Sequence, residues 1–155
     1  MTQSPNRPSR EIIQKLRMQA DPEEYKEIRT LWIEHSRAED ARDIPGLMAT
    51  LTDDCVYETP QNGRSWYGKE GATAFYTELL SAFPDVHFDL QEIVIGPQGV
   101  YEEAHVTGTH LGLWNGMEPT GNPIEFEVFI LFPWDREKKL FKGERVYYSI
   151  LSDEL

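Results

Sequence analysis

The chain has little cysteine, a shortage of positive charge and no long hydrophobic run. Its single cysteine, Cys55, excludes an internal disulfide and a cysteine-based metal cluster. Acidic residues outnumber basic ones by 27 to 15, which gives a net charge of -12. Such a surface repels the phosphates of nucleic acids and of anionic lipids. These features predict a protein that binds neither nucleic acid nor membrane and that resides in the cytoplasm.

Several motifs of catalysis and metal binding are also missing. No histidine or cysteine pair has the spacing of a zinc site. There is no glycine-rich phosphate loop of either common type, and Ser149 lacks the flanking glycines of a nucleophile elbow. The sequence therefore predicts no metal site, no nucleotide site and no serine hydrolase.

Apolar periodicity is present and is typical of one globular domain. We expect a flexible tail over residues 1–8 and a single domain over residues 9–155. Asp21 followed by Pro22 is a strong helix start. The expected helices cover residues 10–19, 22–40, 44–51 and 69–83, and the expected strands cover residues 55–59, 86–94, 100–110, 124–134 and 140–151.

The stretch over residues 100–134 is the most informative part of the sequence. In its second strand every other residue is apolar, which indicates one buried face. If the same parity holds in the strand before it, His110 lies on the buried side. The opposite parity is polar, as expected for a hydrated sheet face. Its members are His87, Asp89, Gln91, Glu103, His105, Thr107, Glu125 and Glu127.

Helices followed by consecutive strands with short links predict an α+β fold. The helices should wrap one face of a curved, mostly antiparallel sheet. A curved sheet clasped by helices leaves a conical hollow, which is the natural place for a small-molecule pocket.

The order of several short motifs resembles the SnoaL-like polyketide cyclases of the nuclear transport factor 2-like (NTF2-like) superfamily. The motifs lie at residues 51–58, 68–71, 83–85, 108–110, 119–126 and 144–148. The resemblance implies a cone-shaped barrel, a homodimer through the sheet, and an intramolecular aldol step without metal or organic cofactor. His110 falls on the family's histidine, whereas Ile130 and Ser149 stand where many members carry an acid. Glu58 or Glu102 could supply the acid instead.

Three residues are candidates for acid–base catalysis. His110 could take a proton from an acidic carbon, or it could bond a loop carbonyl and fix the hairpin. His35 follows the apolar stripe of the long helix, so it has a buried partner or touches pocket water. Asp40 and its neighbour Glu39 end that helix, where a carboxylate opposes the helix dipole; the alternative is a solvated helix end.

Large apolar side chains near the expected hollow are candidates for ligand contact, with core or dimer packing as the alternative. They are Trp32, Tyr57, Trp66, Trp114, Met117, Phe126, Ile130 and Tyr147. Trp114 and Met117 lie in a glycine-containing loop that could act as a lid.

The sequence favours a cofactor-free acid–base enzyme that acts on a small hydrophobic carbonyl compound, with His110 as the leading base. The reaction would be aldol cyclisation, isomerisation or dehydration. Two alternatives stay open. An epoxide hydrolase-like enzyme would need an arginine between acids, and Arg145 is the only strand arginine. The other alternative is a protein that binds a small ligand without chemistry.

Overall fold

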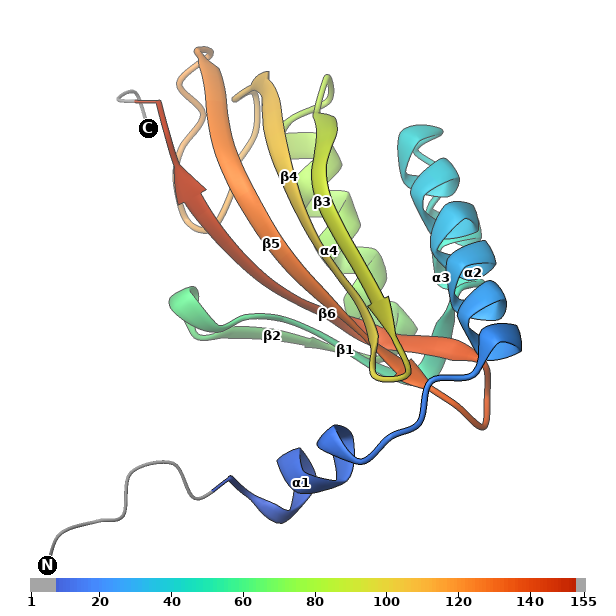
Figure 1. The fold of residues 1–155 in the computed structure, drawn as a ribbon. Helices are drawn as coiled ribbons and strands as arrows, with labels where there is room; N and C mark the ends of the chain where they lie inside the picture. Colours follow the sequence, from blue (N-terminus) through green and yellow to red (C-terminus); the bar gives the residue numbers. More distant parts are fainter. Residues whose placement is uncertain (1–7, 153–155) are drawn as a thin grey trace, which may run out of the picture.

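The computed structural model describes residues 8–152 and has an α+β fold (Figure 1). Residues 1–7 and 153–155 lie outside the described part, and so does most of the expected tail; the single domain over residues 9–155 stays a prediction. The helices are α1 (Arg10–Leu16), α2 (Pro22–Asp40), α3 (Ile44–Met48), η1 (Pro60–Asn62) and α4 (Gly68–Ala82). The strands are β1 (Leu51–Thr59), β2 (Arg64–Tyr67), β3 (His87–Gly96), β4 (Gly99–Thr109), β5 (Pro123–Asp135) and β6 (Leu140–Ile150).

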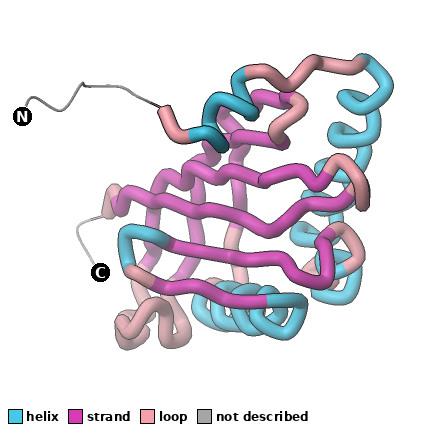
Figure 2. Tube along the Cα trace, turned by 90° about the horizontal axis from the view of Figure 1, so that it is seen from below, coloured by secondary structure: helices cyan, strands magenta, loops and turns pink. Residues whose placement is uncertain are grey.

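The six strands form one curved, unclosed sheet in the order β2-β1-β6-β5-β4-β3. All neighbours are antiparallel except β1 and β6, which run parallel. Seen from below, the sheet bends round the side on which the helices gather (Figure 2). The curved, mostly antiparallel sheet wrapped by helices confirms the expected fold class.

Two long helices cover the inner face of the sheet. Helix α2 packs against β3 and β4, and α4 packs against β1 and β2. Helix α1 lies apart from this layer, below the sheet in Figure 1. The inner sides of the strands and of both long helices supply the buried core, which includes Ile28, Tyr76, Val106, Phe126 and Phe132. The expected alternation in β4 and β5 is confirmed by their burial patterns.

Most element boundaries follow local signals in the sequence. Asp21 caps α2, because its side chain accepts a hydrogen bond from the backbone N–H of Glu23 at 2.9 Å. Ser9 caps α1 in the same way. Strand β2, with only four residues, was not expected, and β1 is longer than expected. Strand β1 begins at Leu51, where we expected the helix over residues 44–51 to end.

A bulge in β3 corrects the expected side of Val94. Leu90 pairs with Ala104 and Glu92 pairs with Glu103, so β3 has one residue more than β4 between these pairs. Such a bulge turns every later side chain to the other face. Val94 is therefore 57% exposed. Regular alternation with Val86, Phe88 and Leu90 predicts it on the inner side instead. Its neighbours Ile93 and Ile95 pack against the core instead.

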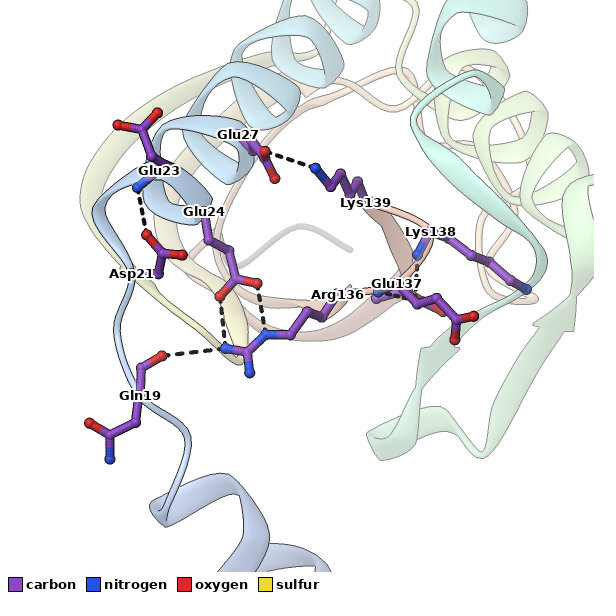
Figure 3. A network of polar contacts seen from close by, with 10 residues as sticks. Gln19, Asp21, Glu23, Glu24, Glu27, Arg136, Glu137, Lys138 and Lys139 are labelled. Carbon is purple, nitrogen blue, oxygen red and sulfur yellow. Dashed lines mark hydrogen bonds and ion pairs between the residues drawn. The ribbon is translucent and has the colours of Figure 1, made fainter.

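Ion pairs join the start of α2 to the turn between β5 and β6 (Figure 3). The guanidinium of Arg136 donates two hydrogen bonds to the Glu24 carboxylate, at 2.7 and 2.8 Å. Lys139 Nζ lies 3.0 Å from the carboxylate of Glu27. We call this group the end clamp: Glu24, Glu27, Arg136 and Lys139. It ties α2 to the sheet at the end away from the loop over residues 111–122.

Within residues 8–152, no helix is long and apolar enough to cross a membrane.

Candidate functional site

The inner face of the sheet and helix α4 enclose a narrow hollow. Its wall is apolar and largely aromatic, with carboxylates among the lining residues. The lining residues are Glu39, Thr59, Trp66, Phe75, Glu78, Leu79, Phe88, Trp114, Asn115, Phe126, Val128, Ile130, Glu144, Val146 and Tyr148. The empty volume including the open mouth is about 580 Å³, and the centre of a water molecule fits into about 40 Å³ of it. Side chains at the mouth must move before a larger molecule enters.

A polar latch holds the mouth of the hollow. The Arg64 guanidinium donates to Asn115 Oδ1 at 2.7 Å and to the Glu78 carboxylate at 3.0 Å. It also lies 4.4 Å from the centre of the Trp66 ring. The latch joins β2, α4 and the loop after β4. Trp114, on the same loop, stacks 5.5 Å from Phe126. Opening the latch would free this loop and widen the entrance.

Glu144 is the most deeply buried carboxylate on the wall, with 3% of its surface exposed. A bulge in β6 directs it inward. Trp134 pairs with Phe141 and Leu131 pairs with Arg145, so β6 has one residue more than β5 between these pairs. Gly143 occupies the bulge with φ 118°, and a Cβ there would overlap the backbone oxygen of Val56.

A buried histidine lies behind Glu144. The ring of His35 is 2% exposed, and its Nδ1 lies 2.7 Å from the hydroxyl oxygen of Thr50. That hydroxyl donates its own proton to the Leu47 carbonyl at 2.7 Å. The Thr50 oxygen must therefore accept from His35, so Nδ1 carries a proton. Nε2 is left to face the interior.

Tyr76 connects this histidine to the carboxylate. Its hydroxyl donates to Glu144 Oε2 and lies 3.0 Å from His35 Nε2. It also lies 2.8 Å from the hydroxyl of Tyr57. Burial, and then the charge of Glu144, raises the pKa of both tyrosines well above the usual value, so they stay neutral.

One proton can occupy either end of this chain. With the proton on His35 Nε2, the ring donates to Tyr76, and Tyr76 donates to Glu144. With the proton on Glu144, the carboxyl donates to Tyr76, and Tyr76 donates to Nε2. Both arrangements satisfy every partner, and the direct distance from Nε2 to Glu144 Oε2 is 3.3 Å. The geometry therefore allows Tyr76 to pass a proton between the two groups.

Two further carboxyls favour their protonated forms. Burial is the main reason that the pKa of Glu39 is raised well above the usual carboxyl value, and the charges of Glu144 and Glu102 add to it. Burial, then the charge of Glu144, raises the pKa of Glu102 to about 8, although Trp32 Nε1 donates to it at 3.1 Å. The site thus combines two carboxyls that favour the neutral form with a third, Glu144, that is hydrogen-bonded to Tyr76.

The strands on either side of Ile130 carry acids that face the same side of the sheet. Ile130 lines the hollow and pairs with Glu102 on one side and with Val146 on the other. Glu102 points from the same inner face, and Glu144 lies two residues from Val146 along β6. Acids on the two flanking strands therefore surround an apolar position.

His110 has the expected burial but lies outside the hollow. It is fully buried, and its ring centre lies 5.4 Å from that of Phe83. It is not among the residues that line the hollow. Neither ring nitrogen has a hydrogen-bond partner among the described residues. No contact joins it to His35, so the structure does not bring the two histidines together.

The other predicted site residues divide into two groups. Trp66, Trp114, Phe126 and Ile130 line the hollow. The remaining predicted site residues do not line the hollow. Asp40 is exposed, and its neighbour Glu39 is the residue on the wall. Tyr147 is 42% exposed on the outer face, while Tyr148 lines the hollow.

Three ligand candidates lie near the hollow without lining it. Tyr57 belongs to the buried tyrosine pair, and Trp32 donates to Glu102. Met117 forms a backbone bridge with Trp114 that closes the loop after β4. The loop over residues 111–122 is thus a packed hairpin in this state, and its role as a lid stays a prediction.

The positions of the arginines do not support the epoxide hydrolase-like alternative. Arg145 and Glu58 form an ion pair at 3.4 Å, and both side chains border the outer groove beside α1. No arginine is among the described residues of the hollow wall, so the Asp-Arg-Asp arrangement of an epoxide hydrolase is not formed there. Within residues 8–152, no group of three or more His, Cys, Asp or Glu side chains is arranged to hold a metal ion.

Comparisons with known proteins agree with the fold. A family model described as SnoaL-like polyketide cyclase matches residues 27–139. Comparison with curated proteins gave no significant match.

Three solved structures illustrate the likeness. A proposed SnoaL-like polyketide cyclase from a Jannaschia species has a TM-score of 0.73 at 16% identity, covering 85% of this chain and 91% of that one. AclR, a proposed hydroxylase from Streptomyces galilaeus, has a TM-score of 0.66 at 19% identity, covering 81% of each chain. A protein with a ketosteroid isomerase-like fold from Catenulispora acidiphila has a TM-score of 0.62 at 16% identity, covering 77% and 85%. At these identities the likeness shows the fold alone.

Proposed function

Because the chain belongs to the SnoaL-like polyketide cyclase family, we propose that it is an acid–base enzyme acting on a hydrophobic carbonyl compound without a cofactor. The observation that carries this proposal is Glu144, a buried and hydrogen-bonded carboxylate on an aromatic wall.

The reaction starts with proton transfer from carbon. Glu144 takes a proton from the carbon next to a ketone, and the electron pair of the C–H bond forms an enolate. In a cyclisation, the enolate carbon attacks a second carbonyl carbon of the same molecule, and a carbon–carbon bond forms. The resulting alkoxide takes a proton from Glu39, which is neutral in the free protein. Isomerisation or dehydration would start from the same enolate.

The buried histidine then resets the base. Protonated Glu144 can pass its proton through Tyr76 to His35 Nε2, since the network accepts it at either end. After the product leaves, His35 loses this proton to solvent and Glu39 takes one up from solvent, which restores both groups. His35 acts through Tyr76 and does not touch the hollow. In this mechanism Glu144, in place of His110, is the base, and His35 receives the proton through Tyr76.

Glu144→Gln is the direct test. The amide keeps the size of the side chain but cannot take a proton, so we expect the rate to fall by about a hundredfold or more. The measurement is deuterium uptake at the acidic carbons of a cyclic β-diketone in D₂O, followed by NMR. Glu58→Gln on the outer side of β1 is the matched control and should exchange like the parent.

Three outcomes separate the alternatives. Undiminished exchange in a folded Glu144→Gln protein contradicts the proposal. A larger loss in His110→Gln than in Glu144→Gln restores His110 as the base. Binding of the diketone with no exchange in the parent protein identifies a non-catalytic binding protein instead.

We also propose a homodimer through the outer sheet face, in the cytoplasm. Support comes from exposed apolar side chains on that face, Val94, Leu131 and Tyr147. Light scattering on the purified chain should give twice the monomer mass of 18.0 kDa, and Leu131→Glu should lower it. A monomer at high concentration would exclude this assembly.

A further inference from the structure

The ionisable groups on the wall of the hollow are all acidic. Three of the lining residues are glutamates: Glu39, Glu78 and Glu144. No lysine, arginine or histidine is among the described residues that line it. Arg64 at the mouth compensates Glu78. Among residues 8–152, Glu39 has no basic partner within ion-pair distance, and Glu144 has only the buried His35.

The remaining wall offers aromatic faces. Six lining residues are aromatic: Trp66, Phe75, Phe88, Trp114, Phe126 and Tyr148. Aromatic faces carry partial negative charge and attract cations, and amine-binding cages in proteins are built this way. Aromatic faces and carboxyl groups thus line the same space, and both interact favourably with a cation.

Thr59 adds a polar group without a partner. It lines the hollow and is 4% exposed, and its Oγ1 makes no hydrogen bond within the described residues. A buried hydroxyl without a partner is costly, which favours a ligand that bonds to it. The N–H of a protonated amine is such a donor.

We propose that the hollow selects hydrophobic ligands that carry a protonated amine, with the ammonium group between the glutamates and the aromatic wall. The inference rests on the proposed function in one respect: the natural substrate would then be a carbonyl compound with a basic nitrogen. The same wall disfavours ligands that carry a carboxylate or phosphate, because no lysine, arginine or histidine is among the described lining residues to pair with these groups.

Proton release should accompany binding. The pKa of Glu39 is raised by burial and by neighbouring negative charge in the free protein. An ammonium ion beside Glu39 favours the carboxylate, so the carboxyl loses its proton when the amine binds. With such a substrate the proton for the alkoxide would come from the ammonium group instead of Glu39. Calorimetry in buffers of different ionisation enthalpy detects this release directly.

Three probes of nearly the same shape test the choice of charge. They are N,N-dimethyl-2-phenylethylamine, 4-phenyl-2-butanone and 3-phenylpropanoate, which are cationic, neutral and anionic near pH 7. Quenching of tryptophan fluorescence measures binding, since Trp66 and Trp114 line the hollow. We expect the amine to bind at least about tenfold more tightly than the ketone, and the carboxylate to bind most weakly.

Two variants localise the effect. Glu39→Gln should abolish proton release and reduce the preference for the amine over the ketone. Thr59→Val, which keeps the volume and removes the hydroxyl, should weaken the amine more than the ketone. Glu23→Gln on the exposed start of α2 is the control and should leave both affinities unchanged.

The result that overturns the inference is an amine that binds no more tightly than the ketone, or that does not bind. An amine preference retained in Glu39→Gln also overturns it, because the charge would then act elsewhere. Exchange of deuterium into the ketone tests the proposed function separately, so either idea can fail without the other.

Discussion

The two ends of α2 present glutamates to opposite environments. Glu24, in the first turn, meets Arg136, and the hydrogen bond from that guanidinium is the main reason that its pKa is lowered. Glu39, in the last turn, meets an aromatic wall and other acids, and its pKa is raised. The helix dipole favours the first and opposes the second. The same residue type therefore supports the fold at one end and stays available for proton transfer at the other.

The first turn of α2 therefore contributes to stability, and its last turn contributes to the proposed chemistry. The end clamp fixes α2 where the sheet strands meet the turn after β5 (Figure 3). The hollow end leaves carboxyls without a basic partner, which costs stability. A chain that keeps this cost is expected to gain function from it.

The strongest test of the contrast replaces one glutamate at each end. Glu39→Gln removes the proposed proton donor to the alkoxide, so we expect turnover of a cyclising diketone to fall by about tenfold to a hundredfold. Glu24→Gln should leave turnover unchanged and lower the melting temperature. Steady-state rates and thermal melts of the two variants check this, and equal rates for both would remove Glu39 from the mechanism.

The second test uses pH and stability. The pKa of Glu102 is about 8 in the folded protein, against an ordinary value of 4.5. Between these values the folded state holds a proton that the unfolded state lacks, so the free energy of unfolding falls as pH rises through this window. Glu102→Gln should flatten this fall and keep the bond from Trp32. Urea unfolding at about pH 5 and about pH 8 measures it. An unchanged slope would mean that Glu102 is ionised in the fold.

The smallest effect is expected at the end clamp. Arg136→Gln breaks a bidentate pair whose arginine is half exposed, so the loss of stability should be small, and salt should reduce it. Because the pKa of Glu24 is lowered in the fold, the difference from the parent should disappear as pH falls through that pKa. A larger loss at high salt would show that Arg136 acts through packing.

The sequence was most informative where one strand or helix determines the outcome. The alternation from Ile124 to Phe132 sets the buried face of β5 without help from other elements. Asp21 and Pro22 set the start of α2. In both cases the physical cause is local, either side-chain parity or capping.

The rest depends on contacts between distant segments. Tyr76 lies at helical spacing from Ala72, Leu79 and Leu80, so periodicity predicts only a side chain on the apolar face. Its hydroxyl partners are 19, 41 and 68 residues away in sequence. Glu144 follows a bulge, so alternation counted forward from the buried Phe141 would place it outside. The parity it shares with Val146 and Tyr148 was the available signal. Strand β2 is too short to show periodicity.

Gly143 has a consequence for how the pocket could be re-engineered. The bulge at this glycine decides which side of β6 carries the acid, because no larger residue fits against the β1 backbone. A saturation library at residue 143 should therefore return glycine alone among active clones. A design for a different reaction can change residues of the aromatic wall, but residue 143 must remain glycine.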